Sequence, residues 1–214
     1  MLCLNNDVLF EVAKNLIEND VQENVYLFGL SGRQPWHALR RAFASVKIVE
    51  LYDKYYKIGW DRKLAKFEYT GDKPHAKSLL NCIGNNVKEL RIDSNNVIYS
   101  PILRTIMTAK KITSLRAYRK CSAKEITHFI LSCSSSLEIL KIAPSLMTKE
   151  LQNQFTIDTL TLLDMDGLDF FPYCCKISTL VIENIQGYSL WRAFYIRYKF
   201  SFDSGYSISH IYLQ

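Results

Sequence analysis

One short apolar pattern recurs along the chain and constrains its fold more than any other feature. The pattern spans six residues, apolar-x-x-Leu-x-apolar, and LEILKI (137–142) is a clear example. The last four residues of each copy alternate between apolar and other side chains, which predicts a short strand with one buried face. The copies are LAKFEY (64–69), VKELRI (87–92), ITSLRA (112–117), LEILKI (137–142), IDTLTL (157–162), ISTLVI (177–182) and ISHIYL (208–213).

The copies are regularly spaced. Their central residues, from Phe67 to Ile211, are separated by 23, 25, 25, 20, 20 and 31 residues. A single strand of this kind cannot bury its apolar face, whereas a strand stacked on similar neighbours can. The period therefore predicts a repeat architecture. Its parallel strands are expected near residues 66–70, 89–93, 114–118, 139–143, 159–163, 179–183 and 210–214.

Helical patterns lie between successive strands. In AKEITHFILSC (123–133), apolar residues recur at i, i+3, i+4 and i+7 from Ile126, which places them on one face of a helix. Comparable segments are KSLLNCI (77–83) and PILRTIMTAK (101–110). The repeating unit is therefore a strand, a loop and a helix. The shorter intervals after residue 140 favour 3₁₀ or irregular segments instead.

Over residues 64–214 this organisation resembles the leucine-rich repeat. Cysteines shortly before several hexamers, at Cys82, Cys133, Cys174 and Cys175, are similar to those of the cysteine-containing subclass. The resemblance implies an α/β solenoid with a curved parallel sheet inside and short helices outside. An ordinary α/β domain with several similar strands is the alternative.

The first 46 residues do not follow the repeat. Apolar residues recur at helical spacing in residues 4–16, and two further apolar segments follow at 25–33 and 35–43. This pattern predicts a module of three short helices. Residues 47–63, which are rich in tyrosine, are expected to form a linker or cap between this module and the repeats.

Two groups of residues in the module match the residue pattern of a known protein family. They are Leu4, Asp7, Val8, Leu9, Val12 and Leu16, followed by Leu30, Ser31, Arg33 and Trp36. The groups resemble an F-box, although Asn5 stands where that family has proline. The resemblance implies docking on the Skp1 subunit of a cullin ubiquitin ligase. The residues expected to contact Skp1 are Leu4, Val8, Leu9, Val12, Leu16, Leu30 and Trp36. A helical cap over the apolar end of the first repeat is the alternative.

Composition and charge limit the remaining classes. The chain has 214 residues and a net charge of +6, and residues 76–144 hold 11 basic and 4 acidic side chains. A basic patch and an ordinary solvated face both fit this excess. No apolar run approaches the roughly 18 residues of a membrane span, and the start of the chain lacks a secretory signal. The six cysteines form no CxxC pair, which favours reduced thiols. We expect a cytoplasmic or nuclear protein without membrane contact.

No catalytic motif is present. The chain lacks HExxH, GxSxG and GxxxxGK[ST], and its four histidines have no nucleophile or carboxylate at a characteristic spacing. Asp164, Asp166 and Asp169 lack the ligand pattern of a calcium loop and predict a solvated loop. We therefore expect no enzymatic activity, no cofactor and no metal.

Partner contacts are expected on the strand positions that flank the central leucine, because these face the concave side of such a solenoid. Three cations follow the central residue on adjacent strands about 4.8 Å apart, so they repel one another in the absence of an acidic guest. The substrate-binding residues expected from these columns are Arg91, Arg116, Tyr118, Ile139 and Lys141.

An acidic or phosphorylated protein substrate would neutralise these cations. Local neutralisation by Glu89 and Asp93 is the alternative. Nucleic acid is disfavoured, because the basic region is narrow and has no interleaved aromatic residues for base stacking.

Together, the two resemblances predict a non-catalytic substrate-recognition adaptor of an SCF-type ubiquitin ligase. Skp1 would bind the helical module, and a protein substrate would bind the repeats. A leucine-rich-repeat scaffold without a ligase role, whose N-terminal helices only cap the solenoid, is the second hypothesis. The last hexamer (208–213) has no polar cap after it, which favours a fragment or an unusual chain end.

Overall fold

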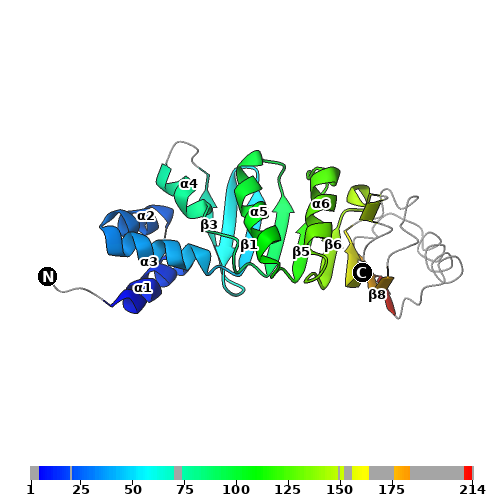
Figure 1. Cartoon of the computed structure of the whole chain (residues 1–214), viewed down its shortest axis with the longest axis horizontal. Helices are drawn as coiled ribbons and strands as arrows, with labels where there is room; N and C mark the ends of the chain where they lie inside the picture. Colours follow the sequence, from blue (N-terminus) through cyan, green and yellow to red (C-terminus); the bar gives the residue numbers. More distant parts are fainter. Residues whose placement is uncertain are drawn as a thin grey trace, which may run out of the picture. The chain divides into compact units, whose positions relative to one another are not determined.

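The computed structural model shows an α/β protein, in which three N-terminal helices precede a mostly parallel sheet interleaved with further helices (Figure 1). The chain divides into two compact units. The first unit comprises Met1–Leu90 and Asn96–Lys111, and the second comprises Arg91–Asn95 and Ile112–Gln214. The structure describes residues 5–19, 21–69, 74–148, 150–151, 156–163, 176–183 and 210–213.

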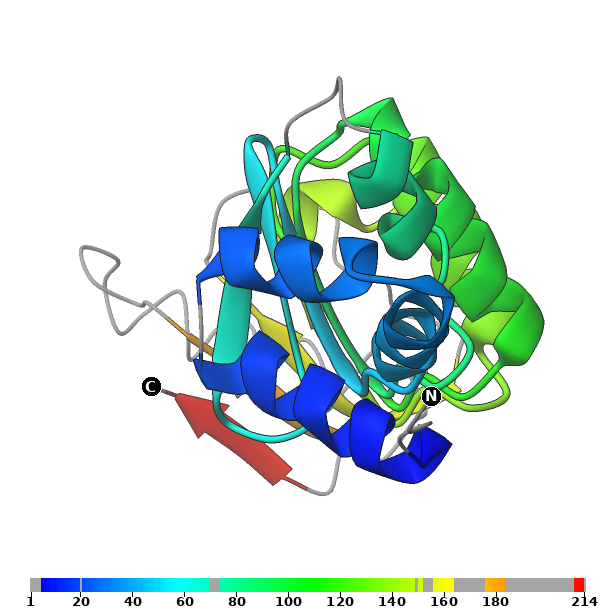
Figure 2. The ribbon, with the colours of Figure 1, turned by 90° about the vertical axis from the view of Figure 1, so that its left-hand side faces the viewer.

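The three helices predicted at the N-terminus are confirmed. They are α1 (Asn6–Asn19), α2 (Gln22–Leu30) and α3 (Arg33–Ala44). Both α1 and α2 pack against α3 (Figure 2). Gly29 permits a close approach of α2 to α3, because a Cβ atom at this position would lie only 2.7 Å from Cδ2 of Leu39.

The segment 47–63, predicted as a linker or cap, contains two strands of an antiparallel sheet. β1 (Ile48–Tyr52), β2 (Tyr55–Gly59) and β3 (Leu64–Glu68) pair antiparallel in chain order. The sequence did not predict this secondary structure within the segment. The hexamer 64–69 does form a strand, but it pairs with β2 and is not the first strand of the parallel series.

The helices and the antiparallel strands share an aromatic core centred on Phe67, which is 1% exposed. The ring of Phe67 lies 5.4 Å from that of Phe43 in α3 and 5.5 Å from that of Tyr56 in β2, measured between centroids. The ring of Tyr26 in α2 lies 6.5 Å away. Aromatic pairs at such distances add to the stabilisation from burial. The helical module and β1–β3 are therefore parts of one folded core in the first unit.

The edge of β3 is covered by a side chain from α2. Nε2 of Gln22 donates to the carbonyl oxygen of Glu68 at 3.0 Å, and Oε1 of Gln22 accepts from the Glu68 N–H at 2.8 Å. The amide therefore makes the two hydrogen bonds that a neighbouring strand would make. Uncovered strand edges favour pairing with other chains, so this contact protects the sheet.

The six other hexamers each overlap a strand, as predicted. Among the described residues, the strands follow the order β3-β2-β1-β4-β5-β6-β7-β8-β9, and β5 to β9 pair in parallel. The register places the central residues Leu115, Leu140, Leu160 and Leu180 side by side, and each is fully buried. The strands are β4 (Glu89–Asp93), β5 (Ser114–Ala117), β6 (Ile139–Ile142), β7 (Thr156–Leu162), β8 (Lys176–Ile182) and β9 (His210–Leu213).

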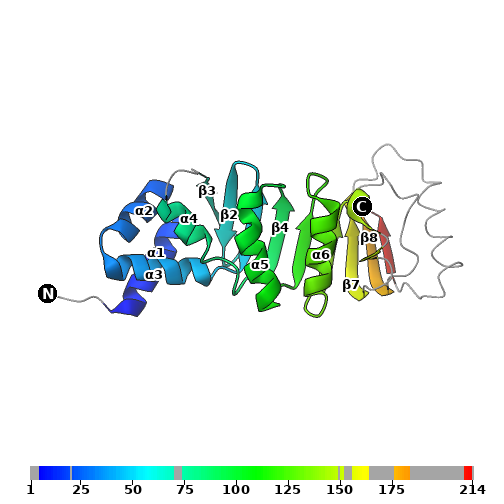
Figure 3. The same cartoon turned by 45° about the horizontal axis from the view of Figure 1, so that its top comes forward.

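The helices predicted between the strands are also confirmed, with small shifts of their ends. α6 lies over β5 and β6 (Figure 3) and buries the apolar face that begins at Ile126. A 3₁₀ helix, η2, follows β6, in agreement with the short interval before the next strand. These elements are α4 (Pro74–Leu80), η1 (Val97–Tyr99), α5 (Ser100–Ala109), α6 (Ala123–Cys133) and η2 (Pro144–Leu146).

Two buried tyrosines of the first unit, Tyr56 and Tyr99, have raised pKa values. Burial raises the pKa of Tyr56 well above its usual value and also raises the pKa of Tyr99. The Tyr99 hydroxyl donates to the carbonyl oxygen of Tyr52 at 2.7 Å, which holds the turn between β1 and β2. In the unfolded chain both tyrosines ionise near pH 10, about the ordinary tyrosine pKa.

We therefore expect stability to be lost as the pH rises above about 10, because the unfolded chain then releases phenolic protons that the folded state retains. Thermal unfolding followed at increasing pH tests this, with Tyr56→Phe as the matched variant. The alkaline decrease in the melting temperature should be smaller in Tyr56→Phe. Equal decreases in the two proteins would contradict the assignment.

Candidate functional site

The face of the parallel sheet opposite α6 presents columns of side chains in the predicted order. In β5, Leu115 and Ala117 are buried, whereas Ser114 and Arg116 point to the other face and remain half-exposed. The register pairs Arg116 with Lys141 and Ser114 with Ile139, which is 37% exposed. The expected neighbouring positions on adjacent strands are therefore confirmed for these residues.

Two arginines of this face contact one tyrosine. The guanidinium carbons of Arg91 and Arg116 lie 4.6 and 5.1 Å from the ring centroid of Tyr118, within the range of cation–π attraction. Partial burial raises the pKa of Tyr118, and the two arginines oppose this shift. Its backbone N–H donates to the carbonyl oxygen of Ile92 at 3.1 Å, which fixes Tyr118 beside β4.

The carboxylate of Glu183, which directly follows β8, forms ion pairs with two cations of this face. Oε2 of Glu183 lies 3.6 Å from Nη2 of Arg116, and its Oε1 lies 3.1 Å from Nζ of Lys141. All three side chains are about one-fifth to one-third exposed, so these ion pairs are partly shielded from water. We refer to these side chains as the Tyr118 cluster, which consists of Arg91, Arg116, Tyr118, Lys141 and Glu183.

Glu183 is the residue that the sequence interpretation missed. Neutralisation by Glu89 and Asp93 was the expected alternative to an acidic partner, yet Glu183 provides the ion pairs to Arg116 and Lys141. Backbone hydrogen bonds continue the parallel register one residue beyond the strands, so Tyr118, Ala143, Leu163 and Glu183 occupy one column. Ala143 and Leu163 are buried and apolar. The Glu183 side chain therefore reaches back across two strands to the cations.

Arg116 contributes an unsatisfied donor to the cluster. Nε of Arg116 is buried and has no hydrogen-bond partner among the described residues. A buried donor without an acceptor costs about 1–3 kcal/mol. The cluster's own side chains therefore do not use all of its hydrogen-bond donors. This donor and the three cations allow the cluster to bind a further anion.

The helical module exposes some of the residues expected to contact Skp1 and buries others. Val8, Val12 and Leu30 are 48%, 40% and 60% exposed, while Leu16 and Trp36 are half-buried. Leu9 is 4% exposed and belongs to the core of the module, so it presents little surface for the direct contact expected of it. Leu4 lies outside the described residues.

Around Val8 and Val12, the surface of α1 forms a shallow hollow that is lined also by Asp7, Glu11 and Asn15. Leu27 on α2 is 65% exposed, although the sequence interpretation did not select it. Its position within the continuous apolar run VYLFGL could not distinguish an exposed residue from a buried one. The module therefore presents apolar side chains on both α1 and α2.

Comparison of the chain with protein-family models, with curated proteins and with solved structures found no match. Any functional conclusion therefore depends on the surfaces described above.

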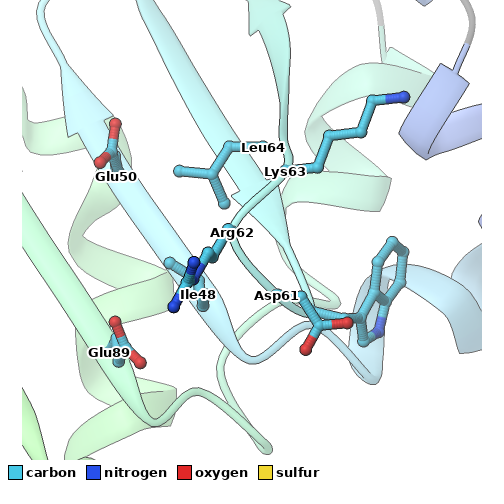
Figure 4. A pocket seen from close by; sticks show the side chains of 8 residues that line it. Ile48, Glu50, Asp61, Arg62, Lys63, Leu64 and Glu89 are labelled. Atoms are coloured by element: carbon cyan, nitrogen blue, oxygen red, sulfur yellow. The ribbon is translucent and has the colours of Figure 1, made fainter.

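A second open hollow lies on the antiparallel strands of the first unit (Figure 4). Ile48, Leu64 and Trp60 give it an apolar part, and acidic and basic side chains, including Glu89 and Arg62, also line it. Another lining residue, Glu50, accepts a hydrogen bond from the Tyr52 hydroxyl at 2.8 Å. Charges of both signs surround this hollow, so its lining selects no single class of ligand.

The described part of the chain offers no metal centre. No three histidine, cysteine, aspartate or glutamate side chains converge there to hold an ion. None of the helices in the same residues combines the length and the apolar composition needed to cross a bilayer. The surfaces that remain as candidates are the Tyr118 cluster and the exposed apolar side chains of α1 and α2.

Proposed function

We propose that this chain is the substrate-recognition adaptor of an SCF-type ubiquitin ligase, with Skp1 bound to its N-terminal helices and a protein substrate bound to its repeats. The observation that carries the proposal is the exposure of Val8, Val12 and Leu30, three positions to which the F-box resemblance assigns Skp1 contacts. Exposed apolar side chains on short helices gain free energy when a partner removes them from water.

The finer architecture belongs to the same proposal: the repeats form a leucine-rich-repeat solenoid whose concave face holds the substrate. The regular spacing of the hexamers, the parallel register of β5 to β9 and the column of buried leucines support it. In such a solenoid Arg116, Ile139 and Lys141 face the substrate. The three cations of the Tyr118 cluster favour a protein partner with an anionic group, acidic or phosphorylated, that can compete with Glu183 for them.

The contribution of the chain to ubiquitin transfer is proximity. A substrate held on the repeats stays close to the ligase subunits that carry ubiquitin, which replaces a bimolecular encounter with one between tethered partners. This role requires no catalytic group, cofactor or metal in the chain itself.

A leucine-rich-repeat scaffold without ligase activity is the second candidate. The contacts of Gln22 with the edge of β3, and of Tyr26 and Phe43 with Phe67, favour it, because these contacts give the N-terminal helices a capping role. Capping uses the inner faces of the helices, however, and leaves Val8 and Val12 exposed. The two candidates therefore differ in whether these exposed valines bind Skp1.

Substitution of the two valines separates the candidates. The double variant Val8→Asp/Val12→Asp should reduce Skp1 capture by at least about 100-fold, because two apolar contacts of about 1.5 kcal/mol or more each would be lost. Capture of purified Skp1 by the immobilised full chain measures the effect. Leu9→Asp is unsuitable, because a charge in the core of the module would unfold it.

Val97→Asp is the matched control, because Val97 is 78% exposed and lies outside the helical module. It should bind Skp1 as the wild type does, and circular dichroism should show that both variants retain their helices. If the double variant captures Skp1 as well as Val97→Asp does, the proposed docking surface is wrong. If the wild type captures no Skp1, the adaptor proposal itself is wrong.

A further inference from the structure

The Tyr118 cluster contains its own anion. Glu183 bridges Arg116 and Lys141 with one carboxylate oxygen toward each, so the place where a ligand carboxylate would bind is already taken. A substrate that offers a glutamate or aspartate to these cations would exchange one carboxylate for another. Such an exchange gives little net electrostatic gain, because both groups carry a single negative charge.

A phosphate group differs from Glu183 in two respects. It carries a charge of about −1.5 to −2 near neutral pH, and it has three strong acceptor oxygens. The additional charge would interact with Arg91, which also contacts the Tyr118 ring, as well as with Arg116 and Lys141. The additional oxygens can accept from a planar guanidinium, which presents several N–H donors in a fork that suits phosphate.

Arg116 has donor capacity that Glu183 does not use. Its contact with the Glu183 carboxylate involves Nη2, whereas Nε is buried without a hydrogen-bond partner in the described part of the chain. Asp93 also acts on Tyr118 electrostatically, so the cluster together with Asp93 comprises three positive and two negative side chains among the described residues. A phosphate that displaces Glu183 would balance the excess positive charge of the cluster. A ligand carboxylate that displaces Glu183 would leave the net charge of the cluster unchanged.

We propose that the Tyr118 cluster binds the phosphate of a phosphorylated protein substrate, and that Glu183 acts as an internal competitor that excludes substrates which are merely acidic. This inference depends on the proposed function in one respect, namely that the repeat strands hold a protein partner. It adds a specificity rule, which is that phosphorylation of the partner is required and a glutamate in its place is insufficient.

The test applies three pools of degenerate peptides to the immobilised full chain. The central residue is fixed as phosphoserine in one pool, glutamate in the second and serine in the third. The wild type should retain the phosphoserine peptides at least about tenfold better than the glutamate peptides. Glu183→Gln should increase retention of the glutamate peptides and reduce this preference. Arg116→Met should lose the phosphoserine peptides. Inorganic phosphate at high concentration should compete only weakly, because it lacks the peptide contacts.

Glu138→Gln is the matched control, because Glu138 is exposed, directly precedes β6 and makes no ion pair in the cluster. It should retain the wild-type preference. Equal retention of phosphoserine and glutamate peptides by the wild type would overturn the inference, and so would an unchanged preference in Glu183→Gln. Selective retention of polyuridine RNA without phosphopeptide binding would also overturn it.

The Skp1 capture experiment distinguishes this inference from the adaptor proposal. Skp1 capture without a phosphopeptide preference would refute only the specificity rule. A phosphopeptide preference that depends on Glu183, without Skp1 capture, would support the phosphate site and reject the ligase role.

Discussion

Leu140→Ala is expected to lower the free energy of unfolding by about 3–5 kcal/mol. Leu140 is fully buried and lies between Leu115 and Leu160 in the parallel register of β5, β6 and β7. Removal of its side chain leaves a cavity in the middle of this column, and neighbouring strands held by backbone hydrogen bonds cannot close it. Denaturant unfolding of the full chain measures the loss.

Ile139→Ala provides the control on the same strand. Ile139 immediately precedes Leu140, but its side chain points to the opposite face and is 37% exposed. Its truncation should change the free energy of unfolding by less than about 1 kcal/mol. Similar losses for the two variants would mean that the hexamer leucines do not form the buried column of the sheet.

Phe67→Ala should have an effect of similar size in the first unit, with a loss of about 3–5 kcal/mol. The Phe67 ring contacts aromatic rings from α2, α3 and β2, so its removal weakens both the core of the antiparallel strands and the attachment of the helices to them. Thermal unfolding and hydrogen exchange of the α2 and α3 amides report these two effects separately.

Leu27→Ala is the control for this second prediction, because Leu27 is 65% exposed on α2 and should contribute little to stability. If Phe67→Ala lowered stability without increasing exchange in α2 and α3, the helices would not depend on this core. The capping role inferred from the Phe67 contacts would then be contradicted.

The sequence predicted the parallel strands well, because a repeated leucine at near-constant spacing encodes a repeated environment. Leu115, Leu140, Leu160 and Leu180 occupy equivalent positions in their strands, and each is buried. The helix over 123–133 was equally visible, because its buried residues follow helical periodicity. In both cases one physical requirement, burial of one face, determines the local pattern.

The antiparallel strands were harder to recognise. In β1 the buried residues Val49 and Leu51 alternate with half-buried ones, but the segment lacks the hexamer, and the sequence therefore indicated only a linker or cap. The hexamer 64–69 was recognised as a strand, but the direction of its neighbouring strand was not predicted. A pattern of alternating burial specifies a strand without specifying the direction of its neighbour, and β3 pairs antiparallel with β2.

In the candidate sites, too, the sequence predicted the positions of residues but not their side-chain contacts or burial. The positions of Arg116 and Lys141 followed from strand periodicity and register. The ion pairs with Glu183 did not, because they depend on how far a side chain extends over Ala143 and Leu163. For Leu9, the family resemblance supplied a set of residues but did not indicate which face of α1 is buried.

The central claim is that the N-terminal helices bind Skp1, and the most direct measurement is the interaction of the purified full chain with purified Skp1. Analytical ultracentrifugation of the mixture should show a complex with one copy of each protein. Two separate species at micromolar concentrations of both proteins would contradict the adaptor role, and the N-terminal helices would then be a cap for the repeats.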